Sequence, residues 1–259
     1  MSERMTVDVD GLRASYLTAG TGGPVVLLLH GTWWSRVWQP VLDELAAAVG
    51  ADEPLAVAGH DIGGAVAQHL LVGGMVKVRP LALVNSVTYD SWPVPGVARF
   101  RDPAVVAAVT AQELLAARRT AVTTALARPA TEAELADYLD PWNDSRVRRS
   151  WMALAGADDS RHTLDLVPAL RADGTPKLLV WGEDDTFQEV RYAERFAAEM
   201  PNTTLVRVPG AGHIPMENAP ATVAAARPWL RAYSWHTLTC VRSFLQVKEC
   251  YDRGRAHRR

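Results

Sequence analysis

Short apolar runs alternate with helical patterns along this chain. Five near-continuous aliphatic runs, each followed by a turn, predict buried strands of a largely parallel sheet with helices on both faces. These runs are 25–29, 55–58, 81–84, 177–181 and 204–208. Two segments that alternate more strongly precede them, around 6–10 and 12–18, and predict an antiparallel hairpin turning at Asp10-Gly11. The pattern as a whole is typical of the α/β class.

The pattern changes between the third and fourth runs, where residues 91–174 predict helices alone. Asp102-Pro103 has the form of a helix start, and Thr131 begins a capping box whose helix Pro141 ends. A helical excursion between two parallel strands would cover the carboxyl ends of the strands as a lid. The predicted division is therefore an N-terminal core segment, a lid, a C-terminal core segment and a basic tail, at 1–90, 91–174, 175–231 and 232–259.

Composition narrows the classes of function. The chain is 48% hydrophobic and 22% charged, with a formal net charge of −2, which argues against general affinity for nucleic acid or anionic membranes. No apolar run approaches the roughly 18 residues of a membrane helix, and residues 1–11 lack the apolar stretch of a secretory signal. The two cysteines, Cys240 and Cys250, form no disulfide or zinc pattern. We therefore expect a cytoplasmic protein without a metal site.

The most informative turn lies between the run 55–58 and a predicted helix over 64–71. Its sequence is Gly59-His60-Asp61-Ile62-Gly63. Flanking glycines allow a sharp turn that raises its central side chain above the sheet, and the helix N-terminus favours an anion there. Serine is the common residue at this position, whereas here it is aspartate. Asp61 is therefore the candidate nucleophile, and His60 is expected to pack behind the turn.

Later turns supply an acid and a base. Asp184 and Asp185 follow the run 177–181 and compete for the role of the acid, while His213 follows the last run. Nucleophile, acid and histidine thus occur in the order described for hydrolases with such a turn. An acid can also follow the preceding strand, but Asn85 and Ser86 occupy that place.

A further turn, His30-Gly31-Thr32-Trp33, follows the run 25–29. Backbone N–H groups of Thr32 and Trp33, together with that of Ile62, are candidates for an oxyanion hole.

Four such turns, in this order and at strand ends, resemble the α/β-hydrolase fold. The resemblance is to the branch with an aspartate nucleophile, which contains epoxide hydrolases and haloalkane dehalogenases, and it covers roughly residues 6–230. It implies a mostly parallel sheet with a helical lid, a small apolar substrate, water as co-substrate and no cofactor. Its spacing favours Asp185 over Asp184. Asp61 would form an ester with a substrate carbon, and His213, oriented by Asp185, would activate the water that hydrolyses this ester.

The resemblance leaves two substrates in competition. Epoxide hydrolases place lid tyrosines at the ring oxygen, so Tyr138 and Tyr89 are candidates, and Trp92 and Trp142 are further candidates for the substrate pocket. Dehalogenases commonly carry tryptophan directly after the nucleophile, where this chain has Ile62. Epoxide opening is therefore placed slightly ahead of carbon–halogen cleavage.

Two departures from the family pattern concern the fold. Between Gly31 and Gly59 the chain has room for one helix, over 37–49, but none for a central strand that the family places beside the run 25–29. Either the N-terminal hairpin moves over to pair with that run, or the sheet has a gap. The tail after Leu230 is expected to lie outside the fold and to be disordered at its end.

Alternative functions remain open at this point. The first alternative is a hydrolase of the same fold but of another type, esterase-like or cleaving carbon–carbon bonds. A second alternative is a binding protein on an inactive hydrolase fold, or a truncated product. The other hydrolase and the binding protein keep the fold and change the chemistry, whereas a truncated product would be expected to be unstable or inactive.

Overall fold

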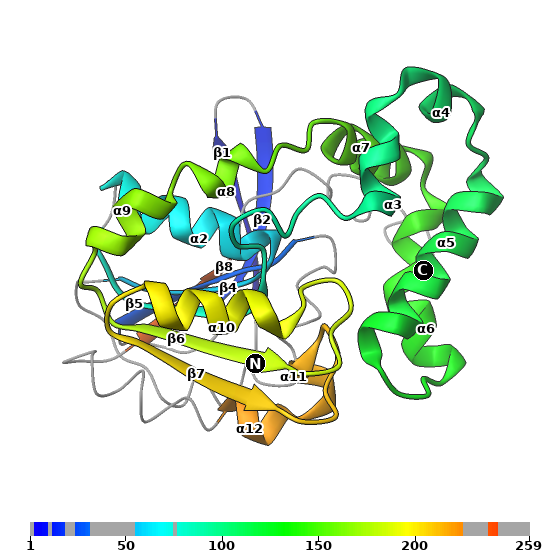
Figure 1. Cartoon of the computed structure of the whole chain (residues 1–259). Coiled ribbons are helices and arrows are strands. Elements are labelled where there is room, and N and C mark those ends of the chain that lie inside the picture. Colours follow the sequence, from blue (N-terminus) through cyan, green and yellow to red (C-terminus); the bar gives the residue numbers. More distant parts are fainter. Residues whose placement is uncertain are drawn as a thin grey trace.

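A computed structural model describes residues 3–9, 12–18, 24–31, 55–74, 77–224 and 238–242. Its centre is a six-stranded sheet in the order β7-β6-β5-β4-β3-β8, and every neighbouring pair is parallel (Figure 1). This confirms the predicted parallel sheet. The strands are β3 (Pro24–Leu29), β4 (Leu55–Asp61), β5 (Val78–Ser86), β6 (Lys177–Gly182), β7 (Thr203–Val208) and β8 (Leu238–Arg242).

The predicted hairpin is confirmed as a separate two-stranded sheet. Strands β1 (Glu3–Val9) and β2 (Leu12–Thr18) are antiparallel and in register from Glu3 opposite Thr18 to Val9 opposite Leu12. The turn expected at Asp10-Gly11 lies outside the described residues. The hairpin therefore does not move over to replace a strand of the main sheet.

The position beside β3 is filled by the tail, which corrects two expectations. Strand β8 pairs with β3 in parallel, from Pro24 opposite Leu238 to Leu28 opposite Arg242, so the described sheet shows no gap there. The tail is also not wholly outside the fold. The physical reason is that the outer edge of β3 offers unpaired backbone groups, which a segment rich in β-branched and apolar residues can satisfy. The helix predicted over 37–49 lies outside the described residues.

The strands bury both faces, as near-continuous aliphatic runs require. Along β5, Leu81 and Leu83 pack into one apolar cluster, while Ala82 and Val84 pack into another on the opposite face. The first cluster is covered by α2 (Ile62–Gly73), α9 (Val167–Ala172) and α10 (Val190–Glu199). On the second face lie α11 (Pro215–Asn218), α12 (Pro220–Ala224) and the inner side of the inserted helices.

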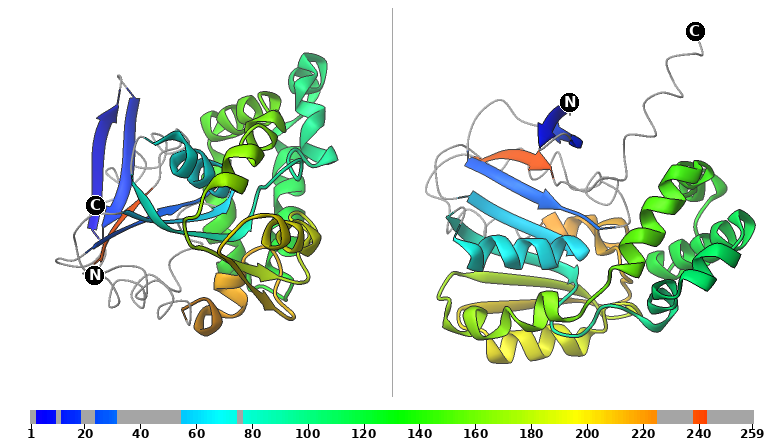
Figure 2. Two further views of the ribbon diagram at one scale, coloured as in Figure 1. Left: turned by 60° about the vertical axis from the view of Figure 1, so that its left-hand side comes forward. Right: turned by 90° about the horizontal axis from the view of Figure 1, so that it is seen from above.

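The segment 91–174 contains helices and no strand, as predicted. Its first part forms a separate group at the end of the sheet where the strands terminate (Figures 1 and 2), and we call this group the lid. The lid helices are α3 (Pro95–Ala98), η2 (Arg99–Arg101), α4 (Pro103–Ala108), α5 (Ala111–Leu126), α6 (Glu132–Leu139), η3 (Asp140–Asn143) and α7 (Ser145–Gly156). The last part, α8 (Arg161–Leu164) and α9, returns along the sheet beside α2.

Local capping explains where the lid helices begin. Asp102 accepts a hydrogen bond from the backbone N–H of Ala104, and Thr131 forms the predicted capping box with Glu134. A second capping box, which the sequence pattern did not single out, joins Thr110 to Glu113 at the start of α5. Within the described residues, no helix is both long and apolar enough to cross a membrane.

Candidate active site

Asp61 ends β4 and precedes the first residue of α2. Its backbone has φ 55° and ψ −131°, a strained conformation for a residue with a side chain. Close packing enforces this turn, because a Cβ on Gly63 would lie 2.5 Å from the carbonyl carbon and oxygen of Leu29. The carboxylate is therefore held at the carboxyl edge of the sheet and at the N-terminus of a helix.

Buried polar side chains form hydrogen bonds with the backbone around the strained turn. Gln68 donates hydrogen bonds to the carbonyls of Gly64, at 2.9 Å, and Val87, at 2.8 Å. Ser86 donates to the carbonyl of Gly59 at 2.8 Å. Since a buried carbonyl without a partner is costly, these contacts stabilise the turn that carries Asp61.

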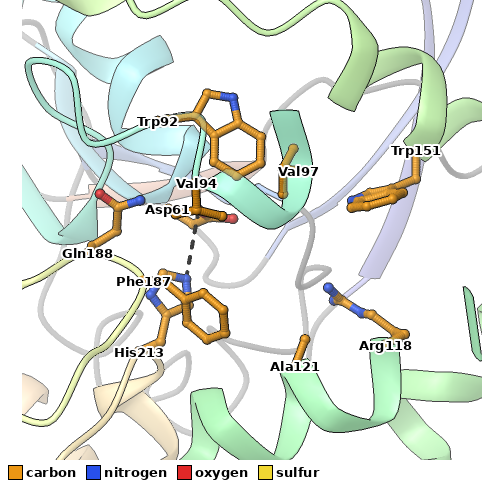
Figure 3. Close-up of a pocket in the computed structure, with 10 residues that line it drawn as sticks. All are labelled: Asp61, Trp92, Val94, Val97, Arg118, Ala121, Trp151, Phe187, Gln188 and His213. Atoms are coloured by element: carbon orange, nitrogen blue, oxygen red, sulfur yellow. Dashed lines mark ion pairs between the residues drawn. The ribbon is translucent and has the colours of Figure 1, made fainter. Parts of the chain in front are cut away.

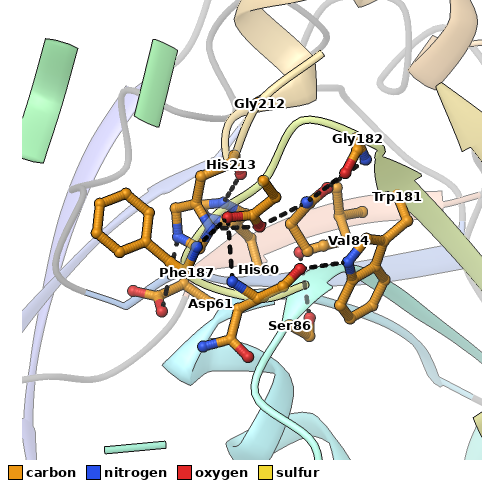
Figure 4. A network of polar contacts seen from close by, with 12 residues as sticks. His60, Asp61, Val84, Ser86, Trp181, Gly182, Phe187, Gly212 and His213 are labelled. Carbon is orange, nitrogen blue, oxygen red and sulfur yellow. Dashed lines mark hydrogen bonds and ion pairs between the residues drawn. The ribbon is translucent and has the colours of Figure 1, made fainter. Parts of the chain in front are cut away.

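At this edge His213 lies between two aspartates, Asp61 and Asp185. Figure 3 shows His213 facing Asp61, and Figure 4 shows His60 beside the same pair. Nδ1 of His213 is 2.8 Å from Oδ2 of Asp185, and Nε2 of His213 is 3.7 Å from Oδ1 of Asp61. All three side chains are buried, whereas Asp184 is exposed. The sequence interpretation of which residues meet thus agrees with the geometry, and the competing aspartate faces away.

The carboxylate of Asp185 is held by four hydrogen bonds. Oδ1 accepts from the backbone N–H groups of Phe187, at 2.7 Å, and Gln188, at 3.0 Å. Oδ2 faces His213 and also accepts from Nδ2 of Asn85 at 2.7 Å. Asn85 is fixed in turn, because its Oδ1 accepts from the backbone N–H of Gly182 at 2.9 Å. Asn85 is thus a positioning residue that sequence reasoning considered only as an absent acid.

The charge of His213 is set by opposing effects. Burial disfavours its protonated form, but the charge and hydrogen bond of Asp185, and the charge of Asp61, outweigh burial. The pKa of His213 is therefore raised above its usual value of 6.5. An imidazole with a strengthened affinity for a proton is suited to accept one from water.

His60 lies directly behind the turn, as expected of a packing residue. Its ring centroid is 4.9 Å from that of His213, and its Nε2 is 2.8 Å from the carbonyl oxygen of His213. Burial, and then the charge of His213, hold the pKa of His60 well below 6.5, so the ring is neutral. A carbonyl can only accept, so Nε2 of His60 is the donor and holds the backbone of His213 in place.

One of the three candidate groups for an oxyanion hole, the backbone N–H of Ile62, belongs to the described residues. A Cβ added to Gly31 would overlap Oδ2 of Asp61 and lie 3.0 Å from the backbone nitrogen of Ile62. Glycine is therefore needed where the chain passes this carboxylate oxygen, and the N–H of Ile62, at the start of α2, lies on the same side. The other two candidates, Thr32 and Trp33, lie outside the described residues.

Asp61 and His213 open into a small cavity beneath the lid (Figure 3). Its volume is about 80 Å³, and a second cavity of about 210 Å³ adjoins it within the lid. Arg118 borders both cavities. The first is lined by Asp61, Trp92, Val94, Val97, Arg118, Ala121, Trp151, Phe187, Gln188 and His213.

The aromatic candidates separate into two groups. Trp92 lines the first cavity and Trp142 the second. Neither tyrosine is among the described residues that line these two cavities. The hydroxyl of Tyr138 donates to Glu217 at 3.0 Å, and that of Tyr89 donates to Glu199 at 3.1 Å. The polar groups at the cavity that sequence reasoning missed are Arg118, Trp151 and Gln188. Nothing in their local sequence marks them, because each comes from a different element.

Among the described residues, no three His, Cys, Asp or Glu side chains lie together as a set that could hold a metal ion.

Solved structures with the same arrangement of elements come from several hydrolases. One is an alpha/beta hydrolase fold protein from Burkholderia ambifaria, with a TM-score of 0.77 and 24% identity over 86% of this chain and 96% of that one. Another is the haloalkane dehalogenase DbeA from Bradyrhizobium elkani, with a TM-score of 0.74 and 20% identity over 90% and 98%.

A serine hydrolase from Cycloclasticus zankles also matches, with a TM-score of 0.72 and 16% identity over 90% of this chain and 99% of that one. The shared fold therefore accommodates more than one kind of hydrolase, and the chemistry must be argued from the site. The model of the alpha/beta hydrolase family matches residues 36–226. The chain thus belongs to the alpha/beta hydrolase family and is a hydrolase of that fold.

Proposed function

We propose that this enzyme hydrolyses a carbon–halogen bond of a small molecule through an ester on Asp61. The observation that carries this proposal is the line from Asp185 through His213 to Asp61, with Asp61 on a strained turn. A carboxylate at the position of the nucleophile suits an sp³ carbon with a leaving group. It suits an acyl substrate poorly, because attack on an acyl group would give a mixed anhydride that reverts easily.

The proposed reaction has two chemical steps. A carboxylate oxygen of Asp61 attacks the carbon, the carbon–halogen bond breaks, and the halide leaves with the electron pair. Nε2 of His213 then removes a proton from water as the water oxygen attacks Cγ of Asp61, and the charge on the oxygen beside Ile62 is stabilised by its N–H. Collapse breaks the ester, releases the alcohol and restores the carboxylate. The net products are the alcohol, the halide and a proton.

Epoxide opening is the second candidate, and the lining of the cavity supports it less. An epoxide oxygen requires a proton when the ring opens, and the sequence interpretation assigned this role to Tyr138 and Tyr89. Both hydroxyls donate to glutamates instead, and neither tyrosine lines the cavity. A departing halide requires only N–H donors, and the guanidinium of Arg118 and the indole of Trp151 border the cavity. This reverses the order expected from sequence.

The decisive experiment traps the ester. Changing His213→Gln removes the base needed for the second step and leaves the first step intact. Incubation with small bromoalkanes, bromocarboxylates and epoxides, followed by peptide mass spectrometry, is expected to show an adduct on the peptide that contains Asp61. The bromo compounds are expected to label it more than the epoxides do.

Two controls define the outcome. His162 is an exposed histidine of α8, so His162→Gln should turn over substrate without accumulating an adduct. Asp61→Asn in the His213→Gln background should remove the adduct. If the double variant still carries it, another residue is the nucleophile. A normally folded protein that shows neither adduct nor turnover would favour the alternative of a binding protein. An adduct found on a serine instead of Asp61 would favour a hydrolase of another type.

A further inference from the structure

Gln188 places a buried amide in the cavity of Asp61. The residue is only 1% exposed, and it lines the first cavity together with Asp61 and His213 but not the second. Figure 3 shows the end of its side chain directed towards Asp61. Within the described part of the chain, neither the oxygen nor the nitrogen of this amide forms a hydrogen bond. Gln188 is thus a polar group beside the reacting carboxylate that the described residues leave unsatisfied.

The main chain of Gln188 is fixed on both sides. Its backbone N–H donates to Oδ1 of Asp185 at 3.0 Å, and its carbonyl accepts from Nε1 of Trp181 at 2.6 Å. The amide is therefore held at one place rather than carried by a loosely bound loop. Because burying a polar group without a partner is costly, such an amide indicates a ligand that binds it during the reaction.

One carboxylate positions both Gln188 and the base. Oδ1 of Asp185 accepts from the backbone of Gln188, while Oδ2 lies 2.8 Å from Nδ1 of His213. The ring of Phe187, the residue before Gln188, packs against the ring of His213 with 5.3 Å between the centroids. Gln188 and His213 therefore reach the cavity from one tightly connected unit. A small molecule that contacts both side chains would be held in a defined place.

The donors suggested for the halide lie elsewhere. In Figure 3, Asp61 stands between Gln188 on one side and Arg118 and Trp151 on the other. Under the proposed function the halide departs towards these two donors, which leaves Gln188 for another partner. The first cavity, at about 80 Å³, exceeds the roughly 10–15 Å³ that one water needs, so it has room for water beside a small alkyl group.

We infer that Gln188 positions the water that hydrolyses the ester on Asp61. This inference rests on the proposed carbon–halogen hydrolysis. Nε2 of His213 accepts one proton of this water while the water oxygen forms its bond to Cγ of Asp61. The other hydrogen stays on the oxygen, donates to Oε1 of Gln188 during the attack, and is released as a proton when the carboxylate is restored. A half-turn of the amide, which breaks no hydrogen bond to the described residues, brings Oε1 to the side of the cavity.

The neutrality of the amide fits this role. Asp61 must be ionised to attack carbon, and a second carboxylate beside it would disfavour that charge. Gln188 supplies an acceptor for water without adding a charge. Its hydrogen bond to water is formed in the second step of the reaction, so removal of the amide should slow the hydrolysis of the ester and leave its formation unchanged.

The test follows a single turnover of 1-bromobutane by the full chain, with rapid quenching and mass spectrometry of the peptide that contains Asp61. In Gln188→Met, a side chain of similar length without an amide, the ester should form within about twofold of the wild-type rate. Its hydrolysis should be about 10- to 100-fold slower, the range of one hydrogen bond to a reacting group. In the steady state, kcat and KM should fall by the same factor, so that kcat/KM is unchanged.

Two further variants complete the comparison. Gln188→Ala is too small to overfill the site and should show the same slow hydrolysis, so the test does not depend on the folding of Gln188→Met. Gln112→Met is the matched control, because Gln112 is an exposed glutamine of α5. It should leave the formation and the hydrolysis of the ester unchanged. Ester formation at the wild-type rate shows in each variant that the protein is folded.

Three results would overturn the inference. The first is an ester that is hydrolysed as fast in Gln188→Met or Gln188→Ala as in the wild type. The second is slower formation of the ester with unchanged hydrolysis and a lower kcat/KM, which would assign Gln188 to the substrate or to the leaving group. The third is a Gln112→Met variant that behaves like Gln188→Met.

Failure of the proposed function would look different from failure of this inference. If His213→Gln carries an ester on Asp61 but the Gln188 variants hydrolyse theirs normally, the ester chemistry stands and the role of Gln188 is rejected. If no ester forms on Asp61 in the wild type or in His213→Gln, both the ester chemistry and the role of Gln188 are rejected.

Discussion

Esterification of Asp61 would change the base that must act next. The charge of Asp61 lies 3.7 Å from Nε2 of His213 and helps to raise the pKa of that histidine. Once Asp61 is esterified, this contribution disappears, while that of Asp185 remains. The pKa of His213 should therefore fall in the intermediate, which makes the neutral base available at a lower pH.

Asp61→Asn mimics this neutral state with little change of shape. We expect the pKa of His213 to be lower in Asp61→Asn than in the wild type, measured by NMR titration of the imidazole. Asp184→Asn is the matched control, since Asp184 is exposed, and it should leave the titration unchanged. A pKa that stays equal or rises in Asp61→Asn would show that the charge of Asp61 does not act on His213.

The raised pKa of His213 in the wild-type protein also links pH to the stability of the fold. The folded-state pKa of His213 is raised above its unfolded value of about 6.5, so protonation of His213 favours the folded state. This contribution is fully present below pH 6.5 and is lost as pH rises through the folded-state pKa. Because Asp61→Asn lowers the folded-state pKa, its free energy of unfolding should gain less on acidification than that of the wild type.

At the scale of elements, lid helix α5 and the loop of His213 are joined at one point. Asn218 donates through Nδ2 to the carbonyl of Leu126 at the end of α5, and its Oδ1 accepts from the backbone N–H of Gly212 at 3.2 Å. The N–H of Ile214 donates to the carbonyl of Ala125 at 3.3 Å. The helix that carries Arg118 thus also holds the segment that carries the base.

Asn218→Ala should loosen this connection without disrupting the sheet. We expect kcat to fall about tenfold, since the loss of two hydrogen bonds at roughly 1 kcal/mol each leaves His213 less well held. Hydrogen exchange at Gly212 and Ile214 should become faster. Asn218→Asp keeps the acceptor for Gly212 and loses the donor to Leu126, so it separates the two contacts. Unchanged exchange and unchanged kcat in Asn218→Ala would mean that the loop is held elsewhere.

At the scale of the whole molecule, the sequence predicted the features that depend on a periodic pattern or on residues next to one another in the chain. The aliphatic runs predicted the parallel strands, and the glycine-flanked turn predicted where Asp61 lies, because each depends on residues next to one another. That an acid after β6 would lie near His213 also followed, since the carboxyl ends of parallel strands share one edge, whereas the choice of Asp185 over Asp184 came from the resemblance to the family. These parts of the fold and site needed no knowledge of distant contacts.

What sequence reasoning missed depends on contacts between distant elements. Arg118 faces Asp61 only because the lid folds over the sheet, and Asn85 reaches Asp185 only because β5 and β6 are neighbours. Tyr138 lies in a lid helix, as predicted, but the orientation of that helix turns its hydroxyl to Glu217. The pairing of β8 with β3 likewise joins segments far apart in the chain.

That pairing leads to a prediction for the entire sheet. If β8 completes the edge beside β3, a chain ending at Thr237 should expose backbone groups of β3, lower the melting temperature and aggregate. A chain ending at Arg242 retains β8 and serves as the matched control, which should melt like the full chain. Thermal melts and light scattering would compare the two. If both truncated chains melt alike and remain monodisperse, β8 contributes nothing to the sheet, and the edge of β3 must be protected by another part of the chain.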